Sequence, residues 1–236
     1  MFSIKKLLVL VICLVTILVI GCTTENNSST NGLGEMGDVA ATVNGVDIKL
    51  EVFQDTVEQM KVSYGQQGFD FEGEEGEEVL EQIKQQAINN LIQQEVLLQE
   101  AKQEGYDATD EMVEEELRNV KTQFPTEEEF EMALEANQLT ENEFKEMLVN
   151  EIQIELLLQS KVEEIAVSED EVEEMYEQYI QQIEQRIEGD KEVQEVPPFE
   201  DVKDQLKAQI QQGKQQEQEE RIIEELMGKS EIQVFI

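Results

Sequence analysis

The residue types that most often mark a catalytic or metal site, histidine and cysteine, are absent or rare in this chain of 236 residues. The sequence contains no histidine, so acid–base catalysis and metal binding lack their most frequent residue. It also lacks the G-x-S-x-G pattern of hydrolases and the G-x-x-x-x-G-K-[ST] phosphate loop. Carboxylates are abundant, but among 55 acidic residues no catalytic pair can be singled out. The composition predicts a protein without catalytic residues, cofactor or bound metal.

Cys22 is the residue whose surroundings predict covalent chemistry. Two lysines precede an apolar run over 7–20, which is shorter than a membrane-spanning helix and typical of a signal-peptide core. The run ends in Val19-Ile20-Gly21-Cys22, which resembles a bacterial lipobox. We interpret 1–21 as a lipoprotein signal peptide and Cys22 as the lipidated (palmitate-bearing) first residue of the mature chain. A cysteine that stands there by chance is the alternative.

The residues after Cys22 predict a tether. Residues 22–38 are polar and rich in glycine and show no periodicity, which is typical of a flexible linker. The only other cysteine, Cys13, lies in the predicted signal peptide, so the mature chain would contain no internal disulfide. The prediction is a folded body held at the extracytoplasmic face of a bacterial cell membrane through Cys22 alone.

The charge of the chain excludes some partners. The formal net charge is −38, and removal of the signal peptide with its two lysines makes it 15 − 55 = −40. Nucleic-acid binders need basic surfaces, so nucleic acid is not an expected partner. A body this acidic also does not lie on anionic lipid. It is expected to be soluble and to repel its own copies.

The elements that must position any functional surface are mainly helices. The longest pattern spans 79–104, where apolar residues recur every three or four positions, as on one face of a helix. The helix is expected to end at Gly105, because glycine accepts the left-handed cap conformation. The apolar stripe is wide and predicts contacts on more than one side: Leu80, Ile83, Ala87, Ile88, Leu91, Ile92, Val96, Leu97, Leu98 and Ala101.

The start and end of the folded region have strand patterns. Residues 39–43 and 46–48 are β-prone and flank Asn44-Gly45, the pair that type I′ hairpin turns prefer. Residues 231–236 alternate, with Ile232, Val234 and Ile236 expected to point inward. Because a hairpin alone is marginally stable, we expect the last strand to join it as a third member. A helix is expected to follow the hairpin over 50–64.

Helix starts are visible in the middle of the chain. Thr109 precedes a pattern over 110–123, and a later helical stripe begins at Phe199 and continues past Gly213 to about residue 228. Three capping boxes, each a Thr or Ser followed three residues later by Glu, predict further starts: Thr126 with Glu129, Thr140 with Glu143, and Ser168 with Glu171. The four glycines between residues 64 and 78 predict a loop, in which Phe69 and Phe71 either pack back onto the body or form an exposed aromatic flap.

The order of these parts carries a resemblance. Residues 39–53 (VAATVNGVDIKLEVF) and 89–117 (NNLIQQEVLLQEAKQEGYDATDEMVEEEL) are similar to the N-terminal region of the SurA/PrsA family of extracytoplasmic chaperones and foldases. Residues 198–236 resemble the C-terminal helix and closing strand of that family. The resemblance implies a mainly α, multi-helix chaperone body with a small β element. It implies one SurA N-terminal-like domain over 39–236, made of 39–188, a break at 189–198, and 199–236.

The departure from the family pattern lies at that break. Family members often carry a parvulin-type prolyl isomerase domain there, with histidines in its active site. This chain has ten residues at that point and no histidine, so we interpret the isomerase domain as absent. Three functions stay open: an ATP-independent holdase for unfolded exported polypeptides, a scaffold lipoprotein that binds one folded partner, and a member of an isomerase lineage that has lost activity.

The holdase hypothesis names a set of contacts. Methionine and aromatic side chains adapt to varied apolar clients, and they are frequent in the middle helices. Each of them could equally be a core residue. The candidate client-binding residues are Phe69, Phe71, Met112, Phe124, Phe130, Met132, Phe144, Met147, Met175, Tyr176 and Tyr179.

The lipidation hypothesis gives a direct prediction. Replacement of Cys22 by Ala removes the sulfur that would carry the lipid, so the protein is expected to leave the membrane fraction or to stay unprocessed. Fractionation and mass analysis of the N-terminus would measure this. Normal processing together with unchanged membrane attachment would contradict the hypothesis.

Overall fold

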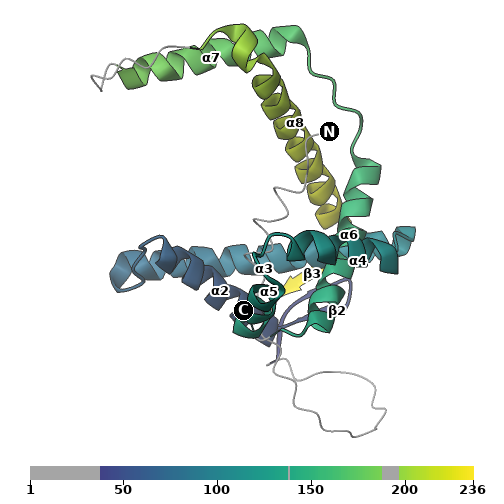
Figure 1. Cartoon of the computed structure of the whole chain (residues 1–236). Coiled ribbons are helices and arrows are strands. Elements are labelled where there is room, and N and C mark those ends of the chain that lie inside the picture. The colour runs from purple at the N-terminus through teal and green to yellow at the C-terminus, as the bar shows by residue number, and fades with distance from the viewer. Residues whose placement is uncertain (1–37, 138, 188–196) are drawn as a thin grey trace, which may run out of the picture. The chain divides into compact units, whose positions relative to one another are not determined.

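The chain folds mainly as α-helix. The structure, a computed structural model, describes residues 38–137, 139–187 and 197–236. Within those ranges it has seven helices and one three-stranded antiparallel sheet (Figure 1). This confirms the expected mainly α fold with a small β element. The predicted signal peptide, Cys22 and the tether lie outside the described residues, as does most of the break at 189–198.

The chain is divided into two compact units. Of the described residues, the larger unit contains 38–157 together with Glu225–Ile236. The smaller unit contains Leu158–Glu224. The single domain over 39–236 stays a prediction, and each unit is described by itself below.

The β element of the larger unit begins with the expected hairpin. Strands β1 (Val39–Val43) and β2 (Val46–Lys49) are joined by Asn44 and Gly45, whose φ values of 52° and 82° are the two positive angles that a type I′ turn requires. Strand β3 (Ile232–Val234) pairs antiparallel with β1, which gives the order β2-β1-β3. The prediction that the last strand joins the hairpin is confirmed.

The predicted burial of β3 is wrong. Ile232 is half-buried, but the side chains of Val234 and Ile236 are 50% and 48% exposed. Backbone hydrogen bonds hold the strand instead: the Asn44 N–H donates to the Glu231 carbonyl at 2.8 Å, and the Phe235 N–H donates to the Ala40 carbonyl at 2.9 Å. Among the described residues, none packs over Val234 and Ile236 closely enough to bury them.

A helical hairpin packs against the sheet. Helix α2 (Leu50–Gln66) buries Phe53, Val57 and Met60, and α3 (Gly73–Glu104) buries most of its predicted stripe. The two helices contact each other, and both contact β1 (Figure 1). Helix α3 ends at Gly105 with φ 79°, as predicted. There the Tyr106 N–H donates to the Ala101 carbonyl and the Gly105 N–H to the Lys102 carbonyl, the pair of bonds of a Schellman motif.

Helix α3 begins earlier than predicted. Gly73 and Gly76 lie in its first turn, in the segment expected to be a loop. A Cβ atom at Gly76 would lie 2.2 Å from the carbonyl carbon of Phe71, so only glycine lets that backbone approach so closely. Gly76 therefore serves helix–loop packing, and the connection between α2 and α3 shortens to 67–72.

Three further helices complete the larger unit: α4 (Asp110–Lys121), α5 (Glu127–Ala136) and the part of α6 (Glu141–Lys161) up to Leu157. Their predicted starts are confirmed. The Thr109 and Thr126 hydroxyls accept the N–H groups of Met112 and Glu129, and Thr140 and Glu143 cap each other reciprocally. The three helices share one buried apolar cluster: Val113, Leu117, Val120, Phe130, Phe144, Leu148 and Ile152.

The smaller unit is built on α7 (Glu169–Ile187) and most of α8 (Phe199–Lys229). Ser168 and Glu171 form the third capping box and so confirm the start of α7. The Lys214 ammonium of α8 pairs with Glu171 and donates to the Ala166 carbonyl. The hydrogen bond from Lys214, together with those from Ser168, lowers the pKa of Glu171 to about 2. Helix α8 passes through Gly213 without a break, as expected.

Two residues of α5 differ sharply in exposure to solvent. Phe130 is 1% exposed, whereas Met132, two positions later, is 61% exposed. Phe130→Ala is expected to lower the free energy of unfolding by about 3–5 kcal/mol because it leaves a cavity. Met132→Ala is the matched control and is expected to change it by less than about 0.5 kcal/mol. Urea unfolding followed by circular dichroism measures both, and equal effects would contradict the packing described.

Candidate functional site

The described residues offer no enclosed chemical centre. They contain no group of three or more His, Cys, Asp or Glu side chains that could hold a metal ion. None of their helices is long and apolar enough to cross a membrane. A pocket of about 510 Å³ lies between α5 and the start of α6, but three of its six lining residues are glutamates, which disfavours an apolar ligand: Glu131, Leu134, Glu135, Leu139, Thr140 and Glu141. The candidate site therefore has to be sought on the surface.

The candidate client contacts in α4–α6 divide into core and surface. Phe130 and Phe144 are buried, and their rings pack edge to face at 5.9 Å between centroids. They are core residues and cannot contact a client, which corrects their place among the candidates. Phe124 packs edge to face with Phe130 at 5.5 Å between ring centroids, and the half-buried Met112 packs against the same cluster. Of the rest, Met147 is half-buried, and Met132 alone in this group is fully exposed.

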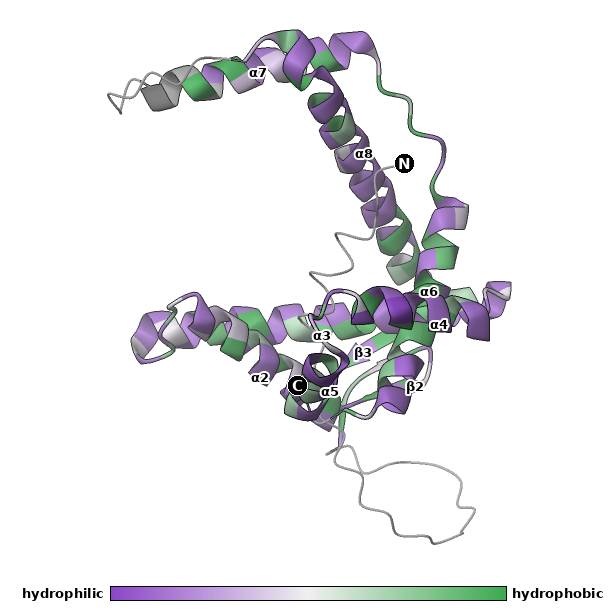
Figure 2. Cartoon of the chain, in the orientation of Figure 1, coloured by the Kyte–Doolittle hydropathy of each residue, from purple (hydrophilic) through white to green (hydrophobic). Residues whose placement is uncertain are grey.

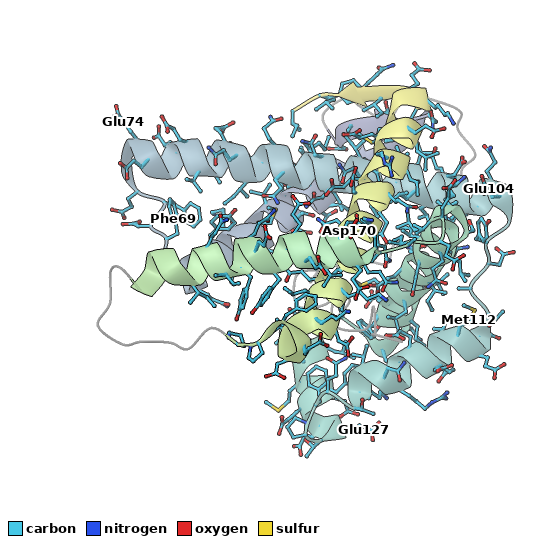
Figure 3. All side chains as sticks on the ribbon, turned by 90° about the horizontal axis from the view of Figure 1, so that it is seen from above. Phe69, Glu74, Glu104, Met112, Glu127 and Asp170 are labelled. Atoms are coloured by element: carbon cyan, nitrogen blue, oxygen red, sulfur yellow. The ribbon has the colours of Figure 1, made fainter. Side chains whose placement is uncertain are left out.

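An aromatic cluster lies at the connection between α2 and α3. Tyr64 and Phe69 pack edge to face at 6.4 Å, and Phe69 and Phe71 at 5.3 Å. We call these three residues the aromatic tip. Phe71 is half-buried beside Gly76, whereas Phe69 is 36% exposed. Figure 3 shows Phe69 near Glu74, at the opposite end of α3 from Glu104. Both expectations for the loop hold in part, because one ring anchors it and the other is presented to solvent.

Acidic residues surround the aromatic tip. Asp70, Glu72, Glu74 and Glu75 are all exposed next to Phe69 and Phe71 in the sequence, and the Asp70 carboxylate accepts the Glu72 N–H at 3.0 Å. In the hydropathy colouring of Figure 2, hydrophilic residues dominate this end of the helical hairpin. An apolar contact point ringed by negative charge suits a ligand that is itself apolar and not acidic.

Of the three candidates in α7, Tyr176 has a structural role within the smaller unit. The Tyr176 hydroxyl donates to the Pro197 carbonyl at 2.8 Å, and its ring packs on Phe199 at 5.2 Å. Tyr176 thus fixes the start of α8 against α7. Met175 and Tyr179 are half-buried. Client binding by these three residues stays a prediction.

Comparison with known proteins identifies the family. A family model described as the SurA-like N-terminal domain matches residues 2–158. The chain belongs to the SurA-like N-terminal domain family. The match ends at Leu158, the residue with which the smaller unit begins, so the rest of that unit, 159–224, lies outside it. The resemblance of residues 198–236 to the family stays a prediction.

Relatives of this SurA-like chain are named as foldases. Foldase protein PrsA of Clostridium acetobutylicum is 33% identical over 129 residues, which cover 52% of this chain and 38% of that protein. Foldase protein PrsA of Clostridium botulinum (strain Okra) is 29% identical over 148 residues, which cover 58% and 43%. The chain thus spans about two fifths of the length of these relatives and is a member of a chaperone and foldase family.

Sequence reasoning missed two features of this SurA-like chain. The first is the exposure of β3 and of the residue after it: Val234 is 50% exposed and Phe235 is 45% exposed. The signal was that residues 234–236 are all apolar. A strand with one buried face alternates apolar and polar residues, so three consecutive apolar residues indicate that some of them are not buried. The second is Glu151 of α6. Burial, Glu116 of α4 and Glu155 one turn away together raise the pKa of Glu151 to about 7.

The raised pKa makes stability depend on pH. The folded state holds the Glu151 proton more tightly than the unfolded state, so folding takes up a proton between about pH 4.5 and 7 and stability falls as pH rises through that window. Glu151→Gln mimics the protonated acid. It is expected to raise the free energy of unfolding by about 1–3 kcal/mol at pH 8 and to change it little at pH 4.

Unfolding curves of the two proteins across this pH range measure the difference. Glu146→Gln, which removes an exposed carboxylate from the same helix, is the control for the change in net charge. A constant difference between Glu151→Gln and the wild type at all pH values would contradict the assignment.

Proposed function

We propose that this protein is an ATP-independent holdase chaperone for unfolded exported polypeptides. The observation that carries the proposal is the aromatic tip, where Phe69 is 36% exposed among carboxylates on a protein of net charge −38. Membership of the SurA-like family and the name foldase carried by its relatives support it. Met132 adds an exposed, adaptable apolar side chain in the same unit.

The physical basis of the activity is weak apolar binding combined with charge repulsion. A client that exposes apolar segments would bury them against Phe69 and its neighbours. Release without nucleotide requires modest affinity, on the order of micromolar or about −8 kcal/mol. The negative charge would keep complexes from associating and would favour basic clients.

Membrane anchoring forms part of the proposal. Lipidated Cys22 and the tether at 22–38 would hold the folded region at the extracytoplasmic face of the membrane. This position would bring it close to polypeptides as they leave the export machinery, before they fold. The division into signal peptide, tether and chaperone region follows from the sequence pattern alone.

We further propose that the chain has no prolyl isomerase activity. The basis is the absence of histidine and the short break at 189–198, which is far smaller than a parvulin domain. Catalysed isomerisation of a proline peptide by pure protein, clearly above the uncatalysed rate, would contradict this part of the proposal.

The holdase proposal is tested by aggregation of denatured clients. A several-fold molar excess of the protein is expected to reduce light scattering by several unrelated clients. Phe69→Ser is expected to weaken this protection several-fold and to lower the melting temperature only modestly, because the side chain is partly exposed and its ring packs on Tyr64 and Phe71 alone among aromatic residues. Gln66→Ser, which changes an exposed polar residue at the end of α2, is the control.

Two outcomes would overturn the proposal. If the protein leaves aggregation unaltered for all clients, it is not a holdase. If a pull-down from the native surface then recovers one partner in stoichiometric amount, the scaffold function replaces it.

A further inference from the structure

The open edge of the sheet is a surface distinct from the aromatic tip. The strand order β2-β1-β3 leaves β3 at one edge, and no strand among the described residues pairs with its outer side. A strand at an edge presents unpaired backbone N–H and C=O groups, which form a template for another strand. Its residues Ile232–Val234 are therefore a candidate docking site for polypeptide backbone.

The pairing with β1 determines which backbone groups are open. The Glu231 carbonyl accepts from Asn44, Gln233 lies opposite Thr42, and the Phe235 N–H donates to Ala40. Successive residues of an antiparallel strand direct their N–H and C=O groups to opposite sides. Ile232 and Val234 thus direct theirs away from β1, toward the open edge.

The side chains beside this edge are apolar and exposed. Val234, Phe235 and Ile236 are 50%, 45% and 48% exposed. Residues 232–236 contain no charged side chain, in a chain in which 31% of residues are charged. Apart from the short length of the strand, the edge has none of the features that natural proteins use to block pairing, such as lysine, proline or a bulge.

We propose that an extended segment of an unfolded client adds to β3 as a fourth strand. The proposal rests on the holdase function and specifies a binding mode for it. Backbone hydrogen bonds would supply affinity whatever the client sequence, which suits a protein that holds many clients. Apolar residues at alternate client positions would pack beside Ile232 and Val234, which lie on the same face of β3.

Charge decides between a client and a second copy as the occupant of the edge. Each copy of this chain has a net charge of −38, so two copies repel each other as their edges approach. A neutral or basic unfolded segment meets no such repulsion, and a basic one is attracted. The occupant that fits is therefore an extended polypeptide with alternating apolar residues and neutral or positive charge.

The first test uses peptides, so the protein stays unchanged. A short peptide of alternating Val and Arg is labelled, and its binding to the full chain is followed by fluorescence anisotropy. Two versions are N-methylated, each on one of the two alternating sets of residues. Because alternate N–H groups of an added strand face β3, one version is expected to bind about tenfold more weakly and the other to bind like the parent. Equal binding by all three peptides overturns the proposal.

The second test changes the edge itself. Val234→Pro removes an N–H group that faces outward and leaves the bonds of Glu231, Gln233 and Phe235 to β1 in place. It is expected to weaken binding of the parent peptide about tenfold with little change in melting temperature. Val234→Thr keeps the N–H group and is the matched control, with a smaller loss expected.

The outcomes separate this inference from the proposed function. If Val234→Pro binds the peptide like the wild type, the edge is not the site, and the holdase function stands as long as aggregation is still suppressed. If the wild type neither binds the peptide nor suppresses aggregation, both proposals fail. If sedimentation shows a dimer that Val234→Pro converts to a monomer, a second copy occupies the edge and the inference is overturned.

Discussion

The burial of the apolar stripe of α3 is the interaction on which the larger unit depends. Helix α2 covers one part of the stripe and β1 another, so the hairpin strands have no stable position without α3. Gln99 of α3 adds a polar link, because its Nε2 donates to the Val43 carbonyl at 3.0 Å. The same side chain accepts from Asn44 Nδ2 at 2.9 Å, which ties the helix to the hairpin turn.

Asn44 connects the hairpin and α3 to the last strand of the chain. Its positive φ forms the turn, its backbone N–H donates to the Glu231 carbonyl, and its side-chain oxygen accepts the Glu231 N–H. One residue therefore joins the hairpin, α3 and β3. Since β3 contributes little apolar burial, these polar links explain how an exposed strand is held in a defined register.

Features of the fold that depend on neighbours in sequence could be predicted from the sequence, and features that depend on packing between distant segments could not. The Asn44-Gly45 turn, the Gly105 cap and the capping boxes at Thr140 and Ser168 involve neighbours in sequence and were predicted correctly. At Thr126 the hydroxyl caps the helix by accepting the Glu129 N–H. Gly76 was misread because its role comes from contact with the Phe71 backbone, whereas glycine in a sequence first indicates a loop. Here the error arose from packing between segments, which composition does not reveal.

The candidate site was less predictable for the same reason. Phe130 and Met132 stand two positions apart on either side of Glu131, so they lie on different sides of α5. The positions of α4 and α6 decide that the side with Phe130 is the buried one. Glu151 has an unusual pKa partly because Glu116 lies across from it on another helix. Phe69 and β3 are exposed because no other described element packs over them, and sequence periodicity does not indicate which elements pack together.

Lys121 shows how a cation of this acidic protein links several helices. Lys121 at the end of α4 pairs with Glu127 and Glu141, at the first turns of α5 and α6, and lies over the Phe130 ring. Hydrogen bonding to Glu141 raises the pKa of Lys121. Each such exposed ion pair adds little to the free energy of unfolding, so burial of the apolar cluster contributes most of the stability of these helices.

The remaining carboxylates are left without enough cations to neutralise them, and this has a consequence for the exposed apolar surface. An uncharged edge strand on a neutral protein would pair with copies of itself. On a protein of net charge −38 the approach of a second copy is opposed, while an unfolded neutral or basic chain can still reach both the aromatic tip and the β3 edge. Net charge and exposed apolar surface are thus physically coupled, because the first allows the second to persist without self-association.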